Sequence, residues 1–236
     1  ERAKGILDYI HNINPEISVR YEFNATQLNE EIIGYLTKLS GDEFNFGLQT
    51  TNPVASKIMN RPFSQDKFEK SYRSLIEKVE SPSITVDIIY GLPGDDYEGY
   101  KKSLEYALNL EKVSWVLTNP LIMLPGSQFS REKEKHGIEI RDEKGFMVSS
   151  TNTFSKEDME KARKISYLAS MVLLNKPLKQ AVKELSNDQG EQCTDTISQF
   201  FDGLGFKIVP GEYPFMIPSN KEDFKERNLA LYHTFN

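Results

Sequence analysis

Cysteine is almost absent from this sequence: Cys193 is the single one among 236 residues. One cysteine cannot form a disulfide within the chain, and it cannot hold a cysteine-based metal cluster, which needs several thiolates. The three histidines, His11, His136 and His233, are scattered and lack the spacing of metal ligands. We therefore predict no metal site built from this chain alone, and a reducing, cytoplasmic setting.

Long apolar runs and an excess of positive charge are also missing. No run approaches the roughly 18 apolar residues of a membrane span, and no signal peptide opens the sequence. The net charge is −6, whereas a nucleic-acid-binding surface needs a basic face. We therefore expect neither a membrane nor a nucleic acid as a partner. With 38% apolar residues, the chain can bury a real core in one large domain or in one domain plus a smaller one.

Strand and helix patterns alternate from the first residues to about residue 137. Short apolar runs predict strands, and apolar positions at helical spacing predict the helices between them. The expected strands are residues 18–24, 43–49, 84–90 and 114–121, and the expected helices are residues 2–13, 26–39 (capped by Thr26 or Asn29), a helix opened by Asn52 and Pro53, 65–79, 97–110 and 128–136. This alternation is typical of a parallel sheet with right-handed crossovers. We expect an α/β fold that lacks its earlier strands, because the chain begins on a helix.

The pattern changes after about residue 140. Apolar positions at helical spacing predict helices over residues 159–174, 177–185 and 194–204. Residues 206–236 are rich in aromatics and prolines, and we expect them to pack across the sheet or to cover an open edge. The chain is therefore divided into an α/β region, residues 1–140, and a mainly helical region, residues 141–236.

Residues 84–96 (ITVDIIYGLPGDD) join an apolar strand to a Gly-Pro turn and a helix start, with Asp87 inside the strand. A strand covered on both faces would bury this carboxylate, and a buried carboxylate needs fixed hydrogen-bond donors from the protein or from a ligand. The carboxyl ends of parallel strands are where α/β folds build their sites. Taken alone, Asp87 is explained best as a structural acceptor for a loop amide.

Three other polar residues stand where an expected strand or helix ends. Glu22 alone fits a surface charge on an edge strand, and Arg61 alone fits a cation at a helix end. Gln49 is the stronger functional candidate, because an amide inside an apolar strand must find hydrogen-bond partners.

Taken together, several weak motifs resemble one family in their order and spacing. They are residues 21–23 (YEF), 46–53 (FGLQTTNP), 60–61 (NR), 87–94 (DIIYGLPG) and 119–126 (NPLIMLPG). Over residues 1 to about 137 their order resembles the latter two-thirds of a radical S-adenosylmethionine (SAM) barrel, in particular the cobalamin-binding-type branch and the oxygen-independent coproporphyrinogen oxidases. The resemblance implies a partial (β/α) TIM-type barrel of parallel strands, followed by a mostly helical appendage.

The resemblance also implies a role for each matching position. Glu22 matches the carboxylate that accepts a hydrogen bond from the methionyl ammonium of S-adenosylmethionine, and Arg61 matches the partner of the methionyl carboxylate. Gln49 and Asp87 match the residues that hold the ribose hydroxyls. Ile89 and Ile122 resemble the apolar walls beside the adenine. No position of this chain is assigned a catalytic or metal-binding role.

The family's CxxxCxxC loop, which holds its 4Fe-4S cluster, is absent from the chain, and so is the glycine-rich loop after the second barrel strand. We interpret the chain as the carboxyl-terminal portion of a radical SAM iron–sulfur enzyme, an oxidoreductase or methyltransferase that is inactive without its missing amino-terminal part. S-adenosylmethionine is the expected cofactor. The parent protein would add the 4Fe-4S cluster and, as an open alternative, cobalamin.

A second function class stays open at this point. The chain is alternatively a non-catalytic α/β module, for small-molecule binding or for protein interaction, that shares only the barrel scaffold. The substrate cannot be deduced, because the region after residue 140 shows no assignable motif. An uncovered sheet edge at residues 18–24 predicts self-association through that edge.

Overall fold

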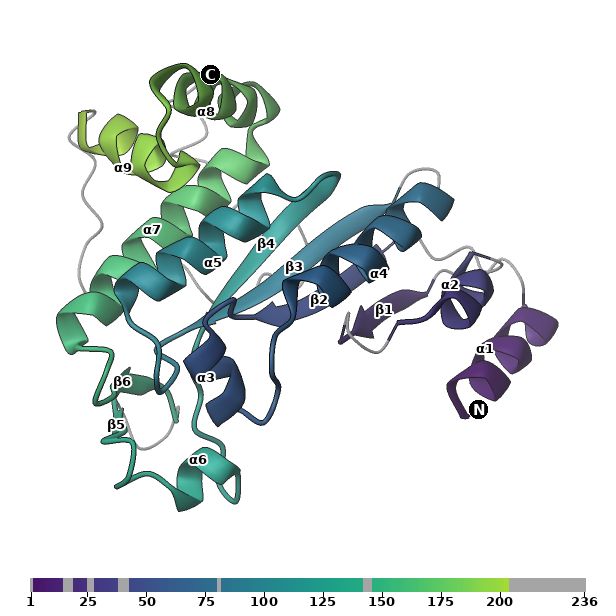
Figure 1. The fold of residues 1–236 in the computed structure, drawn as a ribbon, viewed down its shortest axis with the longest axis horizontal. Helices are drawn as coiled ribbons and strands as arrows, with labels where there is room; N and C mark the ends of the chain where they lie inside the picture. The colour runs from purple at the N-terminus through teal and green to yellow at the C-terminus, as the bar shows by residue number, and fades with distance from the viewer. Residues whose placement is uncertain are drawn as a thin grey trace.

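A single parallel sheet organises the computed structural model, which describes residues 2–14, 19–24, 28–37, 43–79, 82–141 and 146–203. Its strands are β1 (Arg20–Phe23), β2 (Glu43–Gln49), β3 (Ser83–Tyr90) and β4 (Val113–Pro120). They lie in the order β1-β2-β3-β4, and each neighbouring pair is parallel (Figure 1). The predicted α/β partial barrel is thereby confirmed.

Helices connect the strands at the positions that the apolar spacing predicted. They are α1 (Arg2–Ile13), α2 (Glu30–Leu36), α3 (Pro53–Ile58), α4 (Gln65–Lys78), α5 (Tyr97–Asn109) and α6 (Gln128–Arg131). Asn29 caps α2 by accepting a hydrogen bond from the backbone N–H of Ile32 at 2.9 Å. The other candidate cap, Thr26, lies outside the described residues. The expected helix over residues 128–136 is shorter than predicted, since α6 ends at Arg131.

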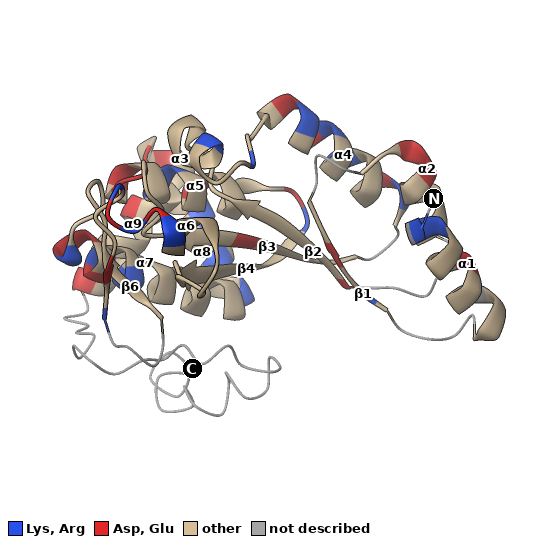
Figure 2. Ribbon diagram, turned by 90° about the horizontal axis from the view of Figure 1, so that it is seen from below, with Lys and Arg blue, Asp and Glu red and all other residues tan. Residues whose placement is uncertain are grey.

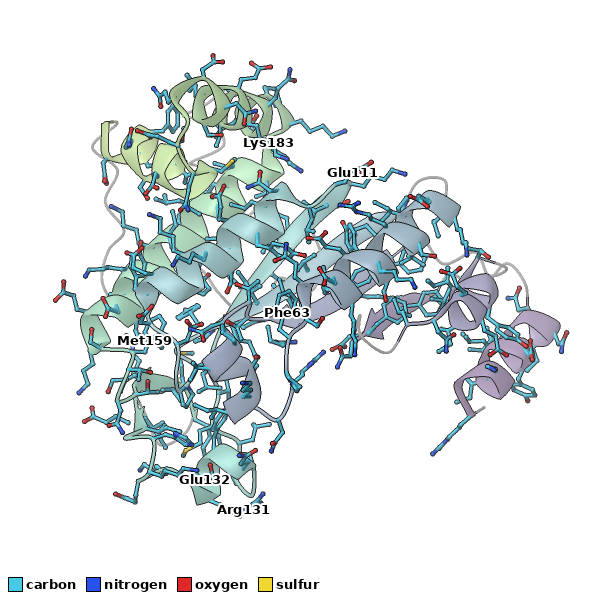
Figure 3. The ribbon with its side chains drawn as sticks, viewed as in Figure 1. Phe63, Glu111, Arg131, Glu132, Met159 and Lys183 are labelled. Atoms are coloured by element: carbon cyan, nitrogen blue, oxygen red, sulfur yellow. The ribbon has the colours of Figure 1, made fainter. Side chains whose placement is uncertain are left out.

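The outer face of the sheet carries the main core. Residues of alternate register on β2 and β3, such as Phe44, Phe46 and Ile88, are fully buried under α4 and α5 (Figure 1). The ring of Phe46 lies 5.1 Å from that of Tyr72 on α4. Phe63, labelled in Figure 3, fills the space between these two helices, with its ring 5.9 Å from Phe68 and 6.0 Å from Tyr106. Such aromatic pairs each contribute about 0.5–1.5 kcal/mol beyond the area that they bury.

The inner face of the sheet is different, and one prediction about it was wrong. Asp87 was expected in a strand covered on both faces. Thr85, Asp87 and Ile89 are instead only partly buried, while the residues between them are buried. The strands are mostly uncharged, and the charged residues gather on the helices (Figure 2). By the strand register, the few charges of the sheet share the inner face with Asp87: Arg20 and Glu22 on β1 and Glu43 on β2.

The carboxyl-terminal helices pack against this α/β unit. They are α7 (Lys156–Leu174), α8 (Lys176–Gln189) and α9 (Cys193–Gly203), and they follow a short antiparallel pair, β5 (Glu139–Ile140) and β6 (Val148–Ser150). The hydroxyls of Tyr100 on α5 and Ser166 on α7 are hydrogen-bonded at 2.5 Å. A shared core thus joins the two regions, and a domain boundary near residue 140 stays a prediction. Residues 206–236 lie outside the described part.

No helix in the described part of the chain is long and apolar enough to cross a membrane.

Candidate binding site at the carboxyl ends of the strands

The end of β2 brings two predicted site residues together over a glycine. The guanidinium Nη2 of Arg61 donates a hydrogen bond to the carbonyl oxygen of Gly47 at 2.9 Å. A Cβ atom on Gly47 would lie 2.7 Å from Gln49 Nε2 and 2.9 Å from Arg61 Nη2. Only glycine leaves room for these two side chains to meet above β2.

Local sequence explains how Arg61 reaches back to the sheet. Asn52 caps α3 by accepting hydrogen bonds from Val54 N and Ala55 N, and Pro53 occupies the first helical turn. The helix ends after one and a half turns, where Asn60 adopts a left-handed conformation with φ +54°. Asn tolerates this conformation better than most residues. The chain therefore reverses at Asn60 and returns the Arg61 side chain to the end of β2.

Asp87 lies on the inner face of β3, and only one of its two carboxylate oxygens has a hydrogen-bond partner among the described residues. Its Oδ2 accepts a hydrogen bond from Asn45 Nδ2 at 2.8 Å. Its Oδ1 is buried and has no hydrogen-bond partner among the described residues. A buried acceptor without a donor costs about 1–3 kcal/mol, so this oxygen is a natural point for a ligand donor.

Burial raises the pKa of Asp87 to about 6, and the nearby charges modify this effect. The hydrogen bond from Asn45 favours the carboxylate, the negative charge of Glu22 disfavours it, and Arg20 and Arg61 favour it. Burial also lowers the pKa of Arg61, against the opposing effects of Glu22 and Asp87. Glu22, Arg61 and Asp87 therefore influence one another's ionisation, and we call these three residues the charged group.

The predicted site residues differ in their position and exposure. Glu22 is exposed on β1, directly beside Asn45 in the strand register. Gln49 is the last residue of β2 and has a left-handed backbone, with φ +68°. Ile89 lies two residues after Asp87 on the same face of β3 and packs against the buried cluster that includes Leu92 and Leu121. Ile122 follows β4, is 48% exposed, and its backbone pairs with Met147. The described contacts do not join Ile122 to the charged group.

Sequence analysis missed two residues of this region. Asn45 stands on the same face of β2 as Gly47, and a polar side chain at this period of two was the available signal. Asp95, in the turn after β3, is 1% exposed and was not singled out. It accepts hydrogen bonds from Thr50 Oγ1 at 3.0 Å, from Asn52 Nδ2 at 2.8 Å and from its neighbour Asp96 N at 3.0 Å. Asp95 thus ties the loop after β2 to the loop after β3.

The same loop after β3 depends on a close approach to α7. Gly91 has φ +83°, and a Cβ atom there would lie 2.6 Å from Met159 Sδ. Met159, at the start of α7, is labelled in Figure 3. Met159 of α7 therefore packs directly against the turn at Gly91, which follows β3.

The described residues contain no group of three or more His, Cys, Asp or Glu side chains arranged to hold a metal ion. Cys193 is buried on α9, where its sulfur lies 3.3 Å from Ser186 Oγ. A 4Fe-4S cluster does not fit these donors. The chemistry of an amino-acid nucleoside is compatible with these groups, since Asp87 Oδ1 has no donor among the described residues and Glu22 and Arg61 carry opposite charges near it.

Parallel strands with helices outside and polar groups at their carboxyl ends define an α/β protein of the barrel type, whose ligands bind at the strand ends. Residues 2–107 match the model of the Radical SAM superfamily, so this part of the chain is similar to that superfamily.

Three known proteins that resemble the chain are longer than it. A heme chaperone from Lactococcus lactis is 24% identical over 161 residues, which cover 62% of this chain and 42% of that protein. The structure of coproporphyrinogen III oxidase from Escherichia coli matches 70% of this chain and 36% of its own, with a TM-score of 0.51 and 19% identity. A radical SAM methyltransferase from Kitasatospora setae, solved with cobalamin and a [4Fe-4S] cluster, matches 73% of this chain and 41% of its own, with a TM-score of 0.55 and 13% identity. The chain thus spans less than half the length of these proteins.

Proposed function

We propose that this chain supplies the S-adenosylmethionine-binding strand ends of a radical SAM iron–sulfur enzyme, and that it is inactive alone. Glu22 accepts a hydrogen bond from the methionyl ammonium, and Arg61 pairs with the methionyl carboxylate. Asp87 and Gln49 hold the ribose hydroxyls, and Ile89 and Ile122 flank the adenine. The observation that carries this proposal is the buried Asp87 Oδ1, which has no donor among the described residues and lies near the charges of Glu22 and Arg61.

The arrangement suits an amino-acid nucleoside for simple physical reasons. A carboxylate and a guanidinium beside each other recognise both charges of a zwitterion. A half-buried carboxylate recognises hydroxyl donors more strongly than a neutral acceptor does, by about twofold in energy. Arg61 is held on Gly47, which leaves its remaining N–H groups for a ligand.

The iron–sulfur cluster of such an enzyme would supply the electron for reductive cleavage of S-adenosylmethionine, while the residues of this chain would bind and orient that molecule. The presence of a single cysteine, which is buried, supports the proposal that the cluster is held by a part of the protein outside residues 1–236. Cobalamin is proposed only as an additional cofactor of the parent protein. The substrate is not assigned.

We further propose that the rest of the protein covers the β1 side of the sheet. β1 ends the strand order, with no described strand beyond it. On the neighbouring helix α1, Ile6, Tyr9 and Ile13 are 51%, 67% and 64% exposed. Their spacing forms one apolar stripe, and a stripe of this kind is normally covered. Self-association of the chain through the same edge is the competing outcome, and sedimentation velocity over a range of concentrations distinguishes the two.

The binding proposal is tested with two ligands and matched variants. In an NMR titration of the chain, S-adenosylhomocysteine should shift the amide signals around Gln49, Arg61 and Ile89, with weak affinity. The probe 5′-methylthioadenosine has the nucleoside but no amino-acid end. Glu22→Gln should therefore weaken only S-adenosylhomocysteine, whereas Asp87→Asn should weaken both ligands.

Glu43→Gln is the control, because it also removes one negative charge, but at the amino end of β2, away from the candidate site at the carboxyl ends of the strands. Equal effects of Glu22→Gln and Glu43→Gln would contradict the assignment of Glu22. If neither ligand shifts signals at the strand ends, the chain is a barrel-scaffold module of another function. Anaerobic iron–sulfur reconstitution should leave the chain without a stoichiometric cluster, and about four irons per chain would refute that part.

A further inference from the structure

Asn45 occupies an unusual position beneath the strand ends. It is 6% exposed, and it lies on the inner face of β2 beside Thr85 of β3. The residue directly opposite Asp87 is Gly47, which has no side chain. The Asn45 side chain reaches diagonally across this gap to Asp87, as neighbouring strands allow.

The contact between the two side chains fixes the orientation of both. Asn45 Nδ2 donates to Asp87 Oδ2 at 2.8 Å. In the opposite amide orientation, Asn45 Oδ1 would face the carboxylate oxygen, and two acceptors repel each other. Asp87 thus sets the direction of the amide, and the amide in turn sets the direction of the carboxylate.

This arrangement carries a cost that a purely structural pair would avoid. Asn45 Oδ1 and Asp87 Oδ1 are both buried without a hydrogen-bond partner among the described residues. Two unsatisfied acceptors on one pair are exceptional, since most buried polar atoms find a partner. The cost is understandable if the pair exists to present an oxygen to a ligand.

We infer that Asn45 is a positioning residue, which holds Asp87 Oδ2 so that Asp87 Oδ1 faces the hydroxyl of a bound nucleoside. This inference rests on the proposed function of Asp87. It adds that the strength of the carboxylate as an acceptor depends on a residue that does not itself touch the ligand.

The charged groups around Asp87 determine how the pKa of Asp87 should change when Asn45 is lost. Glu22 from β1 disfavours the carboxylate, whereas Arg20 from β1 and Arg61 from the loop after α3 favour it. The Asn45 hydrogen bond is the strongest influence that favours the carboxylate. Without it, Asp87 should hold a proton at higher pH and become a poorer acceptor for a hydroxyl donor.

The test replaces Asn45 with leucine, which has a similar shape but no donor, in the full 236-residue chain. Carboxyl ¹³C NMR should show the pKa of Asp87 rising above about 6. The affinity for 5′-methylthioadenosine should fall about tenfold at pH 6.5, and less at pH 8.5, where Asp87 is ionised in either protein. In an Asp87→Asn background, Asn45→Leu should no longer change the pH dependence of binding.

Asn119→Leu is the matched control, because Asn119 lies beside Ile89 on the neighbouring strand β4. It should leave the pKa of Asp87 unchanged. Asn45→Ser, which shortens the side chain, serves if the leucine variant does not fold. An unchanged pKa and affinity in the Asn45 variants would overturn the inference, and so would equal effects of Asn45→Leu and Asn119→Leu. If Asp87→Asn leaves affinity unchanged, the proposed function fails, and the NMR pKa still decides whether Asn45 holds Asp87.

Discussion

Asp87, which is partly buried, and Asp95, which is fully buried, lie eight positions apart in one strand-and-loop segment, and their hydrogen bonding differs. Asp95 receives three donors on its two oxygens, whereas Asp87 receives one donor and leaves one oxygen bare. Burial raises the pKa of both residues, so burial alone does not distinguish them. The difference lies in the satisfied donors. A carboxylate with all its partners within the chain stabilises the fold, and one with a free buried oxygen is available to a ligand.

The largest expected effect is on stability, at Asp95. Asp95→Ala would leave the donors of Thr50, Asn52 and the Asp96 backbone without their acceptor. We expect the free energy of unfolding to fall by about 3 kcal/mol, measured by urea denaturation. Asp96→Ala is the control, since it removes only the helix cap that accepts from Gly99 N, a loss of about 1 kcal/mol. Equal losses in the two variants would contradict the claim that Asp95 stabilises the fold more than the helix cap at Asp96 does.

Asp87→Asn should change the free energy of unfolding in the opposite direction, and raise it. A carboxyl group whose pKa is raised on folding from 3.8 to about 6 stabilises the fold below pH 4 relative to higher pH. Its contribution is lost as the pH rises from about 4 to 6. The variant should therefore be more stable than the natural chain at pH 7.5, by at most about 3 kcal/mol, and nearly equal to it at pH 4. Thermal unfolding at the two pH values measures this, and a destabilised variant at pH 7.5 would show Asp87 to be a structural acceptor.

Gly47→Ala should disturb the site more than the fold. Its Cβ atom would lie 2.7 Å from Gln49 Nε2 and 2.9 Å from Arg61 Nη2, so both side chains must move. We expect a loss of about 1 kcal/mol in stability and a clear weakening of S-adenosylhomocysteine binding. Gly34→Ala, in helix α2 with nothing within 4 Å of the added atom, should instead stabilise the chain by roughly 0.5–1 kcal/mol. Unchanged ligand binding in Gly47→Ala would show that Arg61 does not take part in ligand binding.

The smallest effect is expected at Glu22, which is exposed. Its negative charge disfavours ionisation of Asp87. Glu22→Gln should therefore lower the pKa of Asp87, and carboxyl ¹³C NMR should detect the change while the melting temperature stays nearly the same. A pKa that does not move would mean that solvent screens the two charges from each other.

The sequence predicted the sheet well, because apolar runs and helical spacing report directly on the elements that build the core. It predicted less about the site. Asp87 was expected to be covered on both faces, yet the inner side of β3 is only half-buried, and a local pattern cannot show which layers cover a strand. Asn45 was missed because its importance comes from a diagonal contact with another strand. Asp95 was missed because its three donors come from two loops that meet only in the fold.

The left-handed residue Gln49 links the candidate site to the loop before α5. Its φ of +68° stops the β2 ladder, and the next side chain, Thr50, turns to bond Asp95. One peptide unit therefore separates an amide at the candidate site from the hydroxyl that helps to hold the loop before α5. We therefore expect a molecule bound at Gln49 to stabilise that loop as well. Amide hydrogen exchange at Asp95 and Asp96 should accordingly slow when the strand ends are occupied.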